Sequence, residues 1–181
     1  MARGLSPDLA IASALAGDEG RGLRQIHAVD MHGRVAAWTG QNCVMWCGHV
    51  AGDGVSVAGN MLANERVVPD TLAAFTAAGG EVPERLMAAM LAGEAAGGDR
   101  RGRQSAAMVM TTTEDFPDLS LRVDDHATPL AELARILAIW RRDRAPALSR
   151  APRKAQPAGV IDLDAIEAGW IASGSDLRLR R

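Results

Sequence analysis

The sequence predicts an α+β fold in which the strands pair antiparallel. Short segments that alternate polar and apolar residues are joined by tight turns, and they gather in two groups, residues 25–58 and 105–123. Segments with apolar residues at helical spacing stand before, between and after these groups. Strands and helices that occur in separate runs are typical of the α+β class and not of a parallel α/β sheet.

The first elements are a helix and a hairpin. We expect a helix over residues 7–16, with Ser6 as its N-cap and Pro7 at the first helical position. Residues 25–29 and 34–38 alternate polar and apolar side chains around a tight turn, which predicts two antiparallel strands.

A second strand pair and a helix pair follow. Residues 43–50 and 55–58 are expected to be strands, and residues 59–62 to leave the second of them. Asn64 is a suitable N-cap for a helix that reaches residue 78, and a second helix is expected over residues 81–96. The apolar stripe expected on this second helix consists of Val82, Leu86, Met90 and Leu91. The two helices are expected to pack as a pair on one face of a sheet.

The later part of the chain repeats this pattern on a smaller scale. Residues 105–111 and 119–123 are expected to be strands, and a helix is expected from Thr128-Pro129 to Trp140. Residues 141–157 are rich in proline and arginine without a periodic apolar face, and this composition predicts a mobile linker. A short helix over residues 161–171 and a basic tail, Arg178-Leu179-Arg180-Arg181, complete the chain.

The composition limits the class of protein. The chain has 181 residues, which suits one domain, and its net charge of −2 gives no sign of nucleic acid or of an acidic membrane surface as a partner. It holds no apolar run of membrane-spanning length, no signal peptide, no phosphate-binding loop and no dinucleotide fingerprint. We therefore expect a cytoplasmic protein without a cofactor.

The glycine- and arginine-rich segment Gly97-Gly98-Asp99-Arg100-Arg101-Gly102-Arg103-Gln104-Ser105 connects the helix pair to the later strands. Its glycines allow positive φ, so the loop can turn sharply. One interpretation is a helix end with solvated arginines. The other is the edge of a pocket in which Arg103 and Gln104 contact a ligand, because arginine suits the planar recognition of a carboxylate, with Asp99 nearby.

Four further residues have a functional and a structural interpretation. Asp125 and His126 follow a strand end and suit acid–base chemistry, or they form a turn with a surface histidine. Asn60 can offer an amide to an oxyanion, or it is a turn residue. Thr39 can bind a ligand through its hydroxyl group, or it caps a turn.

The two cysteines form a Cys-x3-Cys-x-His pattern with a nearby histidine. Cys43, Cys47 and His49 would share one face of a strand. A closed zinc site needs four ligands, so we expect small apolar residues in a reducing compartment and no metal.

Several segments together resemble one family, the bacterial domain-of-unknown-function family 1028. The similarity covers roughly residues 5–140. The segments that carry it are Arg24-Gln25, Val29-Asp30, Gly33-Arg34-Val35-Ala36, Thr39-Gly40, Gly59-Asn60-Met61-Leu62, Gly97 to Ala107 and Leu121-Arg122-Val123-Asp124-Asp125-His126.

That family is placed in the Ntn-hydrolase superfamily, and this implies an αββα sandwich of two antiparallel sheets between helical layers. In the superfamily an N-terminal Thr, Ser or Cys attacks an amide, with its own α-amine as the base. The resemblance therefore implies an amide hydrolase in which Asn60 polarises the carbonyl, Arg103 holds a carboxylate, and Asp125 and His126 shape the site.

The chain departs from the family at its start. It opens at Met1-Ala2-Arg3-Gly4-Leu5, which corresponds to the middle of a family member, and Ala2 has no nucleophilic atom. We expect residues 1–140 to be an Ntn-hydrolase-like domain that lacks its first strands and its nucleophile, followed by a linker and tail over residues 141–181. The alternatives are an inactive module that binds a small molecule or peptide, and a truncated product without function. The expected partners are a small amide or carboxylate ligand and, through an unpaired sheet edge, a second copy of the chain.

Overall fold

The structure, a computed structural model, describes residues 4–172. The chain divides into two compact units, one ending at Arg103 and the other beginning at Gln104. The sequence positions Met1 to Arg3 and the basic tail from Arg178 lie outside the described residues. No helix in the described part of the chain is long and apolar enough to cross a bilayer.

The first unit contains one helix, two hairpins and a helix pair, in that order. Its elements are α1 (Pro7–Leu15), a 3-10 turn (Arg21–Leu23), β1 (Gln25–Val29), β2 (Val35–Thr39), β3 (Trp46–Gly52), β4 (Val55–Leu62), α2 (Val67–Ala77) and α3 (Val82–Ala95). β1 pairs antiparallel with β2, and β3 pairs antiparallel with β4. The prediction of antiparallel pairs within an α+β fold is confirmed.

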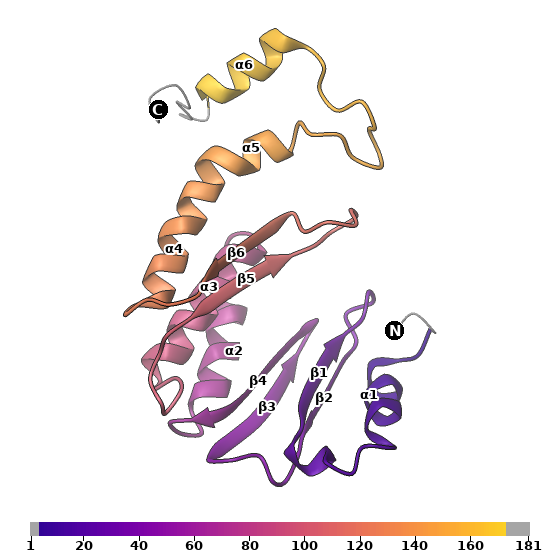
Figure 1. The fold of residues 1–181 in the computed structure, drawn as a ribbon, viewed down its shortest axis with the longest axis vertical. Helices are drawn as coiled ribbons and strands as arrows, with labels where there is room; N and C mark the ends of the chain where they lie inside the picture. The colour runs from indigo at the N-terminus through magenta and orange to yellow at the C-terminus, as the bar shows by residue number, and fades with distance from the viewer. Residues whose placement is uncertain (1–3, 173–181) are drawn as a thin grey trace. The chain divides into compact units, whose positions relative to one another are not determined.

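Contacts between these elements follow a simple order within the first unit (Figure 1). α1 packs on β1 and β2, while β1 and β2 contact β4 and β3. On the other side, α2 packs on β3 and β4, and α3 packs on α2. The core side chains come from these layers of helices: Ile11, Leu15, Val67, Val68, Met87 and Ala89 are buried.

The second hairpin differs from the prediction at both of its outer ends. β3 begins at Trp46 and not at residue 43, because Met45 has a left-handed backbone with φ of 59°. β4 continues through Leu62, although residues 59–62 were expected to leave the strand. Glycine and asparagine usually indicate a turn, but here Gly59 pairs with Gly48 across the hairpin.

The helix pair forms as predicted, but α3 buries a different face. Val82 and Leu91 are 47% and 42% exposed and Leu86 and Met90 are half-buried, whereas Pro83, Met87, Ala89 and Gly93 are buried. A side chain at position 93 would collide with the Thr71 hydroxyl group on α2. The helices therefore approach through small residues, which the stripe of larger apolar residues did not reveal.

The second unit begins with a hairpin and continues in helices. β5 (Ala106–Met110) pairs antiparallel with β6 (Leu119–Val123), and α4 (Pro129–Ile139) packs on both strands. A π-helical turn (Trp140–Arg144) and α5 (Ala145–Leu148) extend α4, and α6 (Leu163–Ala172) follows after a loop. The core of this unit consists of Ala106, Met108, Leu119, Val123, Leu130, Leu133 and Leu137.

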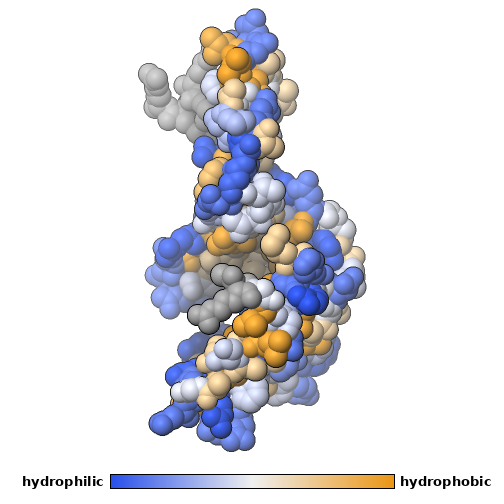
Figure 2. Space-filling model, turned by 90° about the vertical axis from the view of Figure 1, so that its right-hand side faces the viewer, coloured by the Kyte–Doolittle hydropathy of each residue, from blue (hydrophilic) through white to orange (hydrophobic). Residues whose placement is uncertain are grey.

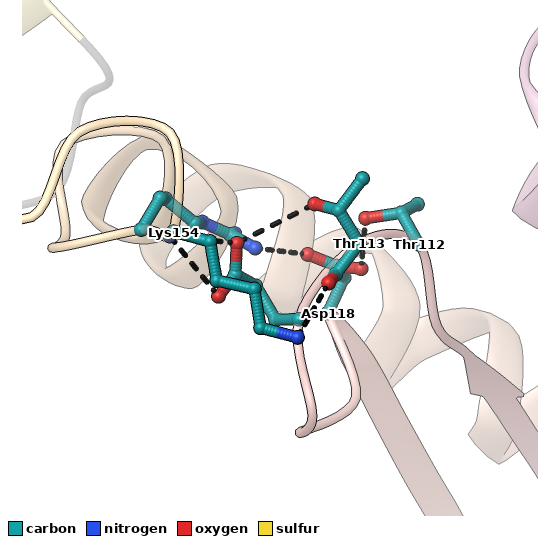
Figure 3. A network of polar contacts seen from close by, with 6 residues as sticks. Thr112, Thr113, Asp118 and Lys154 are labelled. Atoms are coloured by element: carbon teal, nitrogen blue, oxygen red, sulfur yellow. Dashed lines mark hydrogen bonds and ion pairs between the residues drawn. The ribbon is translucent and has the colours of Figure 1, made fainter.

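The mobile linker expected over residues 141–157 is wrong for its first half, which is helical through Leu148. The other half is fixed to the β5–β6 turn by a cluster of polar contacts, which we call the Lys154 clamp (Figure 3). Arg153 pairs with Asp118 at 2.6 Å, and Lys154 Nζ pairs with Asp115 at 2.7 Å. The Lys154 backbone N–H also donates to Glu114.

The Lys154 clamp is expected to make the second unit less stable at acidic pH. The pKa of Asp118 is lowered from its usual 3.8, first by a hydrogen bond from the Thr112 hydroxyl group and then by one from Arg153. A carboxyl group with a lowered pKa in the folded state stabilises that state above its unfolded pKa. This contribution is lost as the pH falls below 3.8 through the lowered pKa.

We therefore expect Asp118→Asn to lower the unfolding temperature at pH 6 and to lower it less at pH 2, measured by circular dichroism at both pH values. Glu132 also has a lowered pKa, but its partner Arg135 lies on α4 outside the clamp, so Glu132→Gln is the control for general acid effects. A constant difference between wild type and Asp118→Asn at both pH values would contradict the role of this carboxylate.

Candidate functional site

Four polar side chains meet between the two hairpins of the first unit. We call them the Gln25 cluster: Gln25, Thr39, His49 and Asn60. Gln25 begins β1 directly opposite Thr39 on β2. His49 lies on β3 and Asn60 on β4, so each of the four strands supplies one residue.

Gln25 is the centre of this cluster. Its Nε2 lies 3.0 Å from Thr39 Oγ1, 3.0 Å from the Gly48 carbonyl oxygen and 2.9 Å from the Gly59 carbonyl oxygen. Its Oε1 accepts a hydrogen bond from Asn60 Nδ2 at 3.3 Å. The side chain of Gln25 thus joins one hairpin to the other.

The contacts of Gln25 assign the orientation of its amide group. A carbonyl oxygen only accepts, so the Gln25 atom near Gly48 and Gly59 is the amide nitrogen, which has no lone pair to offer. The Thr39 hydroxyl hydrogen therefore cannot be donated to Gln25, and the hydroxyl oxygen also lies 2.8 Å from His49 Nδ1. In the His49 tautomer that carries its hydrogen on Nε2, Nδ1 accepts a hydrogen bond from this hydroxyl group.

The backbone around the Gln25 cluster is strained. Met45 and Met61 have φ values of 59° and 54°, and no other described residue except glycine has a positive φ. They flank the outer end of the β3–β4 hairpin, where Met61 N–H donates to the Val44 carbonyl and the pairing shifts register between Trp46 and Gly48. Such strain is found at functional sites more often than elsewhere.

The glycine- and arginine-rich loop runs beside the end of β4. Asp99 forms an isolated bridge with Leu62, and the Arg100 N–H donates to the Met61 carbonyl at 2.8 Å. Gly97, Gly98 and Gly102 have positive φ, which confirms that this loop needs glycine. The loop therefore lies next to the segment that carries Asn60.

The side chains of this loop pair with each other and with α3. Asp99 binds Arg101 at 2.6 Å, and this contact lowers the pKa of the Asp99 carboxyl group. Arg103 Nη1 lies 3.1 Å from Glu94, and among the described residues it contacts no other carboxylate. Both arginine side chains remain more than half exposed.

The three remaining predicted site residues belong to the second unit. His126 N–H donates to the Gln104 carbonyl at 2.9 Å, and His126 Nδ1 accepts from the Thr128 N–H at 3.0 Å. His126 thus caps the turn that leads into α4. Asp125 is exposed, and the neighbouring Asp124 pairs with Arg122. This geometry corresponds to the turn that the sequence also allowed.

The cysteines contact backbone carbonyls. Cys43 Sγ lies 3.6 Å from the Arg24 carbonyl and Cys47 Sγ lies 3.7 Å from the Cys43 carbonyl. Burial raises the pKa of the Cys47 thiol, with a smaller contribution from Cys43. No three His, Cys, Asp or Glu side chains among residues 4–172 converge as metal ligands.

Sequence reasoning named Thr39 and Asn60 but did not include Gln25 or His49 among the site residues. The register of the first hairpin was a usable signal, because it places Gln25 opposite Thr39. His49 was assigned to the cysteine pattern. Its contact with Thr39 depends on the packing of two hairpins, which no local pattern encodes.

Two hollows in the first unit lie outside the Gln25 cluster. One, of about 530 Å³, lies between α1 and β2 and is lined by Ile11, Leu15 and Trp38 among others. Figure 2 shows apolar side chains gathered on the face of the first unit that it draws. The other, of about 430 Å³, lies between α2 and α3. No predicted site residue lines either hollow.

Comparisons with known proteins identify a family and a solved structure to which this chain is similar. The model of a family of unknown function (DUF1028) matches residues 1–133. The crystal structure of protein SPO2555 from Silicibacter pomeroyi, described with the same family, is similar with a TM-score of 0.79 and 29% identity. The similarity covers 88% of this chain and 70% of the Silicibacter pomeroyi chain. No curated protein matches.

Proposed function

This chain belongs to DUF1028, a family of unknown function, and from that premise we propose that it forms the substrate-binding part of an amide hydrolase of the N-terminal-nucleophile type. The observation that carries the proposal is the Gln25 cluster, which holds Asn60 and Thr39 together between two hairpins. The order of contacts in the first unit, from α1 through both hairpins to α2, supports an αββα sandwich.

In this proposal Asn60 polarises the substrate carbonyl. Its Nδ2 uses one hydrogen for Gln25 Oε1, and the side chain is exposed, so the second hydrogen is available to an oxygen that gains negative charge. Thr39 contacts the same substrate through its hydroxyl group. Because Gln25 holds both side chains, the donors are positioned before the substrate binds.

The glycine- and arginine-rich loop supplies the recognition of a carboxylate. Arg103 uses Nη1 for Glu94 and remains about half exposed, which leaves other guanidinium hydrogens for a ligand. Gln104 follows it directly, and Asp99 orients the loop through Arg101 and its bridge to Leu62.

The nucleophile of this reaction is an N-terminal Thr, Ser or Cys supplied upstream of residue 1. The length of the Silicibacter pomeroyi protein, of which 70% is covered, leaves room for such a residue in a relative. The test expresses the protein with the in-frame codons that precede Met1 and measures amine release from a panel of amides and peptides. Release that disappears when the N-terminal nucleophile is changed to Ala supports the proposal, and a folded protein that is inactive on the whole panel contradicts it.

The second candidate is a module that binds the same ligand without chemistry, and the half-exposed Arg103 is the observation that favours it. A carboxylate ligand should raise the unfolding temperature of wild type, and Arg103→Ala should weaken its binding by about 10-fold or more, because a charge-assisted hydrogen bond is lost. Titration with small carboxylates by thermal shift measures this. Arg101→Ala is the matched control, since Arg101 is similarly exposed in the same loop and binds Asp99. Equal losses in both variants would contradict a specific role of Arg103.

A further inference from the structure

Thr39 and His49 have the geometry of a nucleophile and its base. We propose that they form a second reactive centre, in which the Thr39 hydroxyl group accepts an acyl group from a small activated ester. The centre lies wholly within the first unit and needs no N-terminal nucleophile. It shares Thr39, Gln25 and Asn60 with the proposed amide hydrolysis but not the nucleophile of that reaction, so either reaction can fail without the other.

The short contact between Thr39 and His49 is the first observation. Thr39 Oγ1 lies 2.8 Å from His49 Nδ1, which is within the range for proton transfer from a hydroxyl group to a base. Gln25 Nε2, 3.0 Å from the same oxygen, can only donate, so it does not compete with His49 for the hydroxyl hydrogen. In the His49 tautomer that carries its hydrogen on Nε2, the lone pair of Nδ1 faces the hydroxyl group.

Gln25 contributes the second step. Its amide nitrogen has two hydrogens for three acceptors, Thr39 Oγ1 and the carbonyl oxygens of Gly48 and Gly59, so these contacts share them. The hydrogen shared with Thr39 Oγ1 stabilises negative charge that develops on this oxygen as its proton leaves. The other lone pair has no hydrogen-bond partner among the described residues and remains for attack. Gln25 is itself held by two backbone carbonyls, those of Gly48 and Gly59, so it acts as a positioning residue.

The acyl transfer balances with the groups present. Thr39 Oγ1 forms a bond to the ester carbonyl carbon while its proton passes to His49 Nδ1. Collapse of the tetrahedral intermediate breaks the bond to the leaving alcohol or phenol, which takes the proton from His49. Water then hydrolyses the Thr39 ester with His49 as the base, and the acid is released. The exposed Asn60 amide, fixed by Gln25, lies on the same network as a donor for the carbonyl oxygen.

The same hairpins provide an internal comparison. His27 Nδ1 lies 3.0 Å from Ser56 Oγ, and this pair also joins β1 to β4. Among the described residues no side-chain amide donates to Ser56, so its oxygen lacks the donor that Thr39 Oγ1 has. If the Gln25 contact matters, Thr39 reacts and Ser56 does not, even though a serine hydroxyl group is less hindered.

The experiment uses p-nitrophenyl acetate with the full chain in which Cys43 and Cys47 are changed to Ala, because thiols would also be acetylated. We expect release of p-nitrophenolate with an initial burst, and tandem mass spectrometry should find the acetyl group on Thr39. Thr39→Ser should retain the reaction and Thr39→Ala should abolish it. His49→Gln should slow the burst by about 100-fold, the usual contribution of a general base.

A solvent isotope effect separates the base from a structural role. The burst rate of the parent should be lower in heavy water, because a proton moves from Thr39 to His49 as the bond forms, whereas the residual rate of His49→Gln should lack this effect. Ser56→Ala should react as the parent does. Acetyl groups found on Ser56 or spread over other side chains, or an absence of acetylation in protein that circular dichroism shows to be folded, would overturn the proposal.

Discussion

Gly40→Ala is expected to destabilise the protein by about 3 kcal/mol or more, at the upper end of the range for over-packing substitutions. Gly40 is buried directly after β2, and a Cβ atom there would lie 2.6 Å from the Arg21 carbonyl oxygen and even closer to the Gly22 carbonyl group. These are backbone atoms, so no side-chain rotation relieves the contact. The Gly40 N–H also donates to the Arg24 carbonyl at 2.8 Å, which holds the two segments together.

Chemical denaturation followed by circular dichroism measures this effect. Gly17→Ala is the matched control, because a Cβ atom at position 17 meets nothing within 4 Å. We expect that control to lie within about 0.5 kcal/mol of wild type. Because Gly40 follows Thr39, the folded fraction of Gly40→Ala should also lose the acetylation at Thr39. A Gly40→Ala protein as stable as Gly17→Ala would contradict the close approach of these backbone segments.

Leu133→Ala is expected to cost the second unit about 2–5 kcal/mol, the range for removing a buried leucine side chain. Leu133 on α4 is 0% exposed, and α4 packs on both strands of the β5–β6 hairpin. The change would leave a cavity beneath the helix, which the surrounding side chains fill only in part. The measurement is again the free energy of unfolding from denaturant titration.

Leu163→Ala serves as the comparison for this prediction, since Leu163 at the start of α6 is 78% exposed. Its effect should stay within about 0.5 kcal/mol. If the two leucine variants have the same stability, Leu133 does not belong to the core between α4 and the β5–β6 hairpin.

Local patterns predicted those elements whose residues interact mainly with their neighbours in the chain. The first hairpin and β6 lie where the alternation of polar and apolar residues placed them. Pro7 at a helix start likewise indicated α1 correctly, although the Ser6 side chain makes no capping hydrogen bond. In each case a period or a turn within a few residues contains the necessary information.

The misplaced elements depend on particular residues that act against their usual preference. Met45 adopts a left-handed backbone, so β3 begins only at Trp46. Gly59 and Asn60 remain in β4 because the strand pairs with β3 on both sides of Asn60, through Gly59 and through Leu62. Pro146 indicated a break after α4, but it stands in the first turn of α5, where proline needs no hydrogen bond.

The sequence allowed single residues of the site to be predicted, but not the contacts between them. Thr39 and Asn60 are side chains that sequence reasoning could name, yet each meets Gln25 only through the folding of the hairpins. Gln25 and Asn60 are 35 positions apart in the chain. The contacts of His126 are more local. Thr128 lies in the same turn, and Gln104 stands just before β5, the strand that pairs with β6.

The Lys154 clamp also has a practical consequence, because Lys154 is the sole lysine of the sequence. An amine-reactive fluorophore would have one side-chain amine to modify, and that amine is engaged by Asp115 and by the Thr113 carbonyl. Attachment of the dye would remove the charge and release the loop, so the labelling rate itself would report how often the loop opens. Lys154 is thus a position at which a single fluorophore can report the opening of this loop.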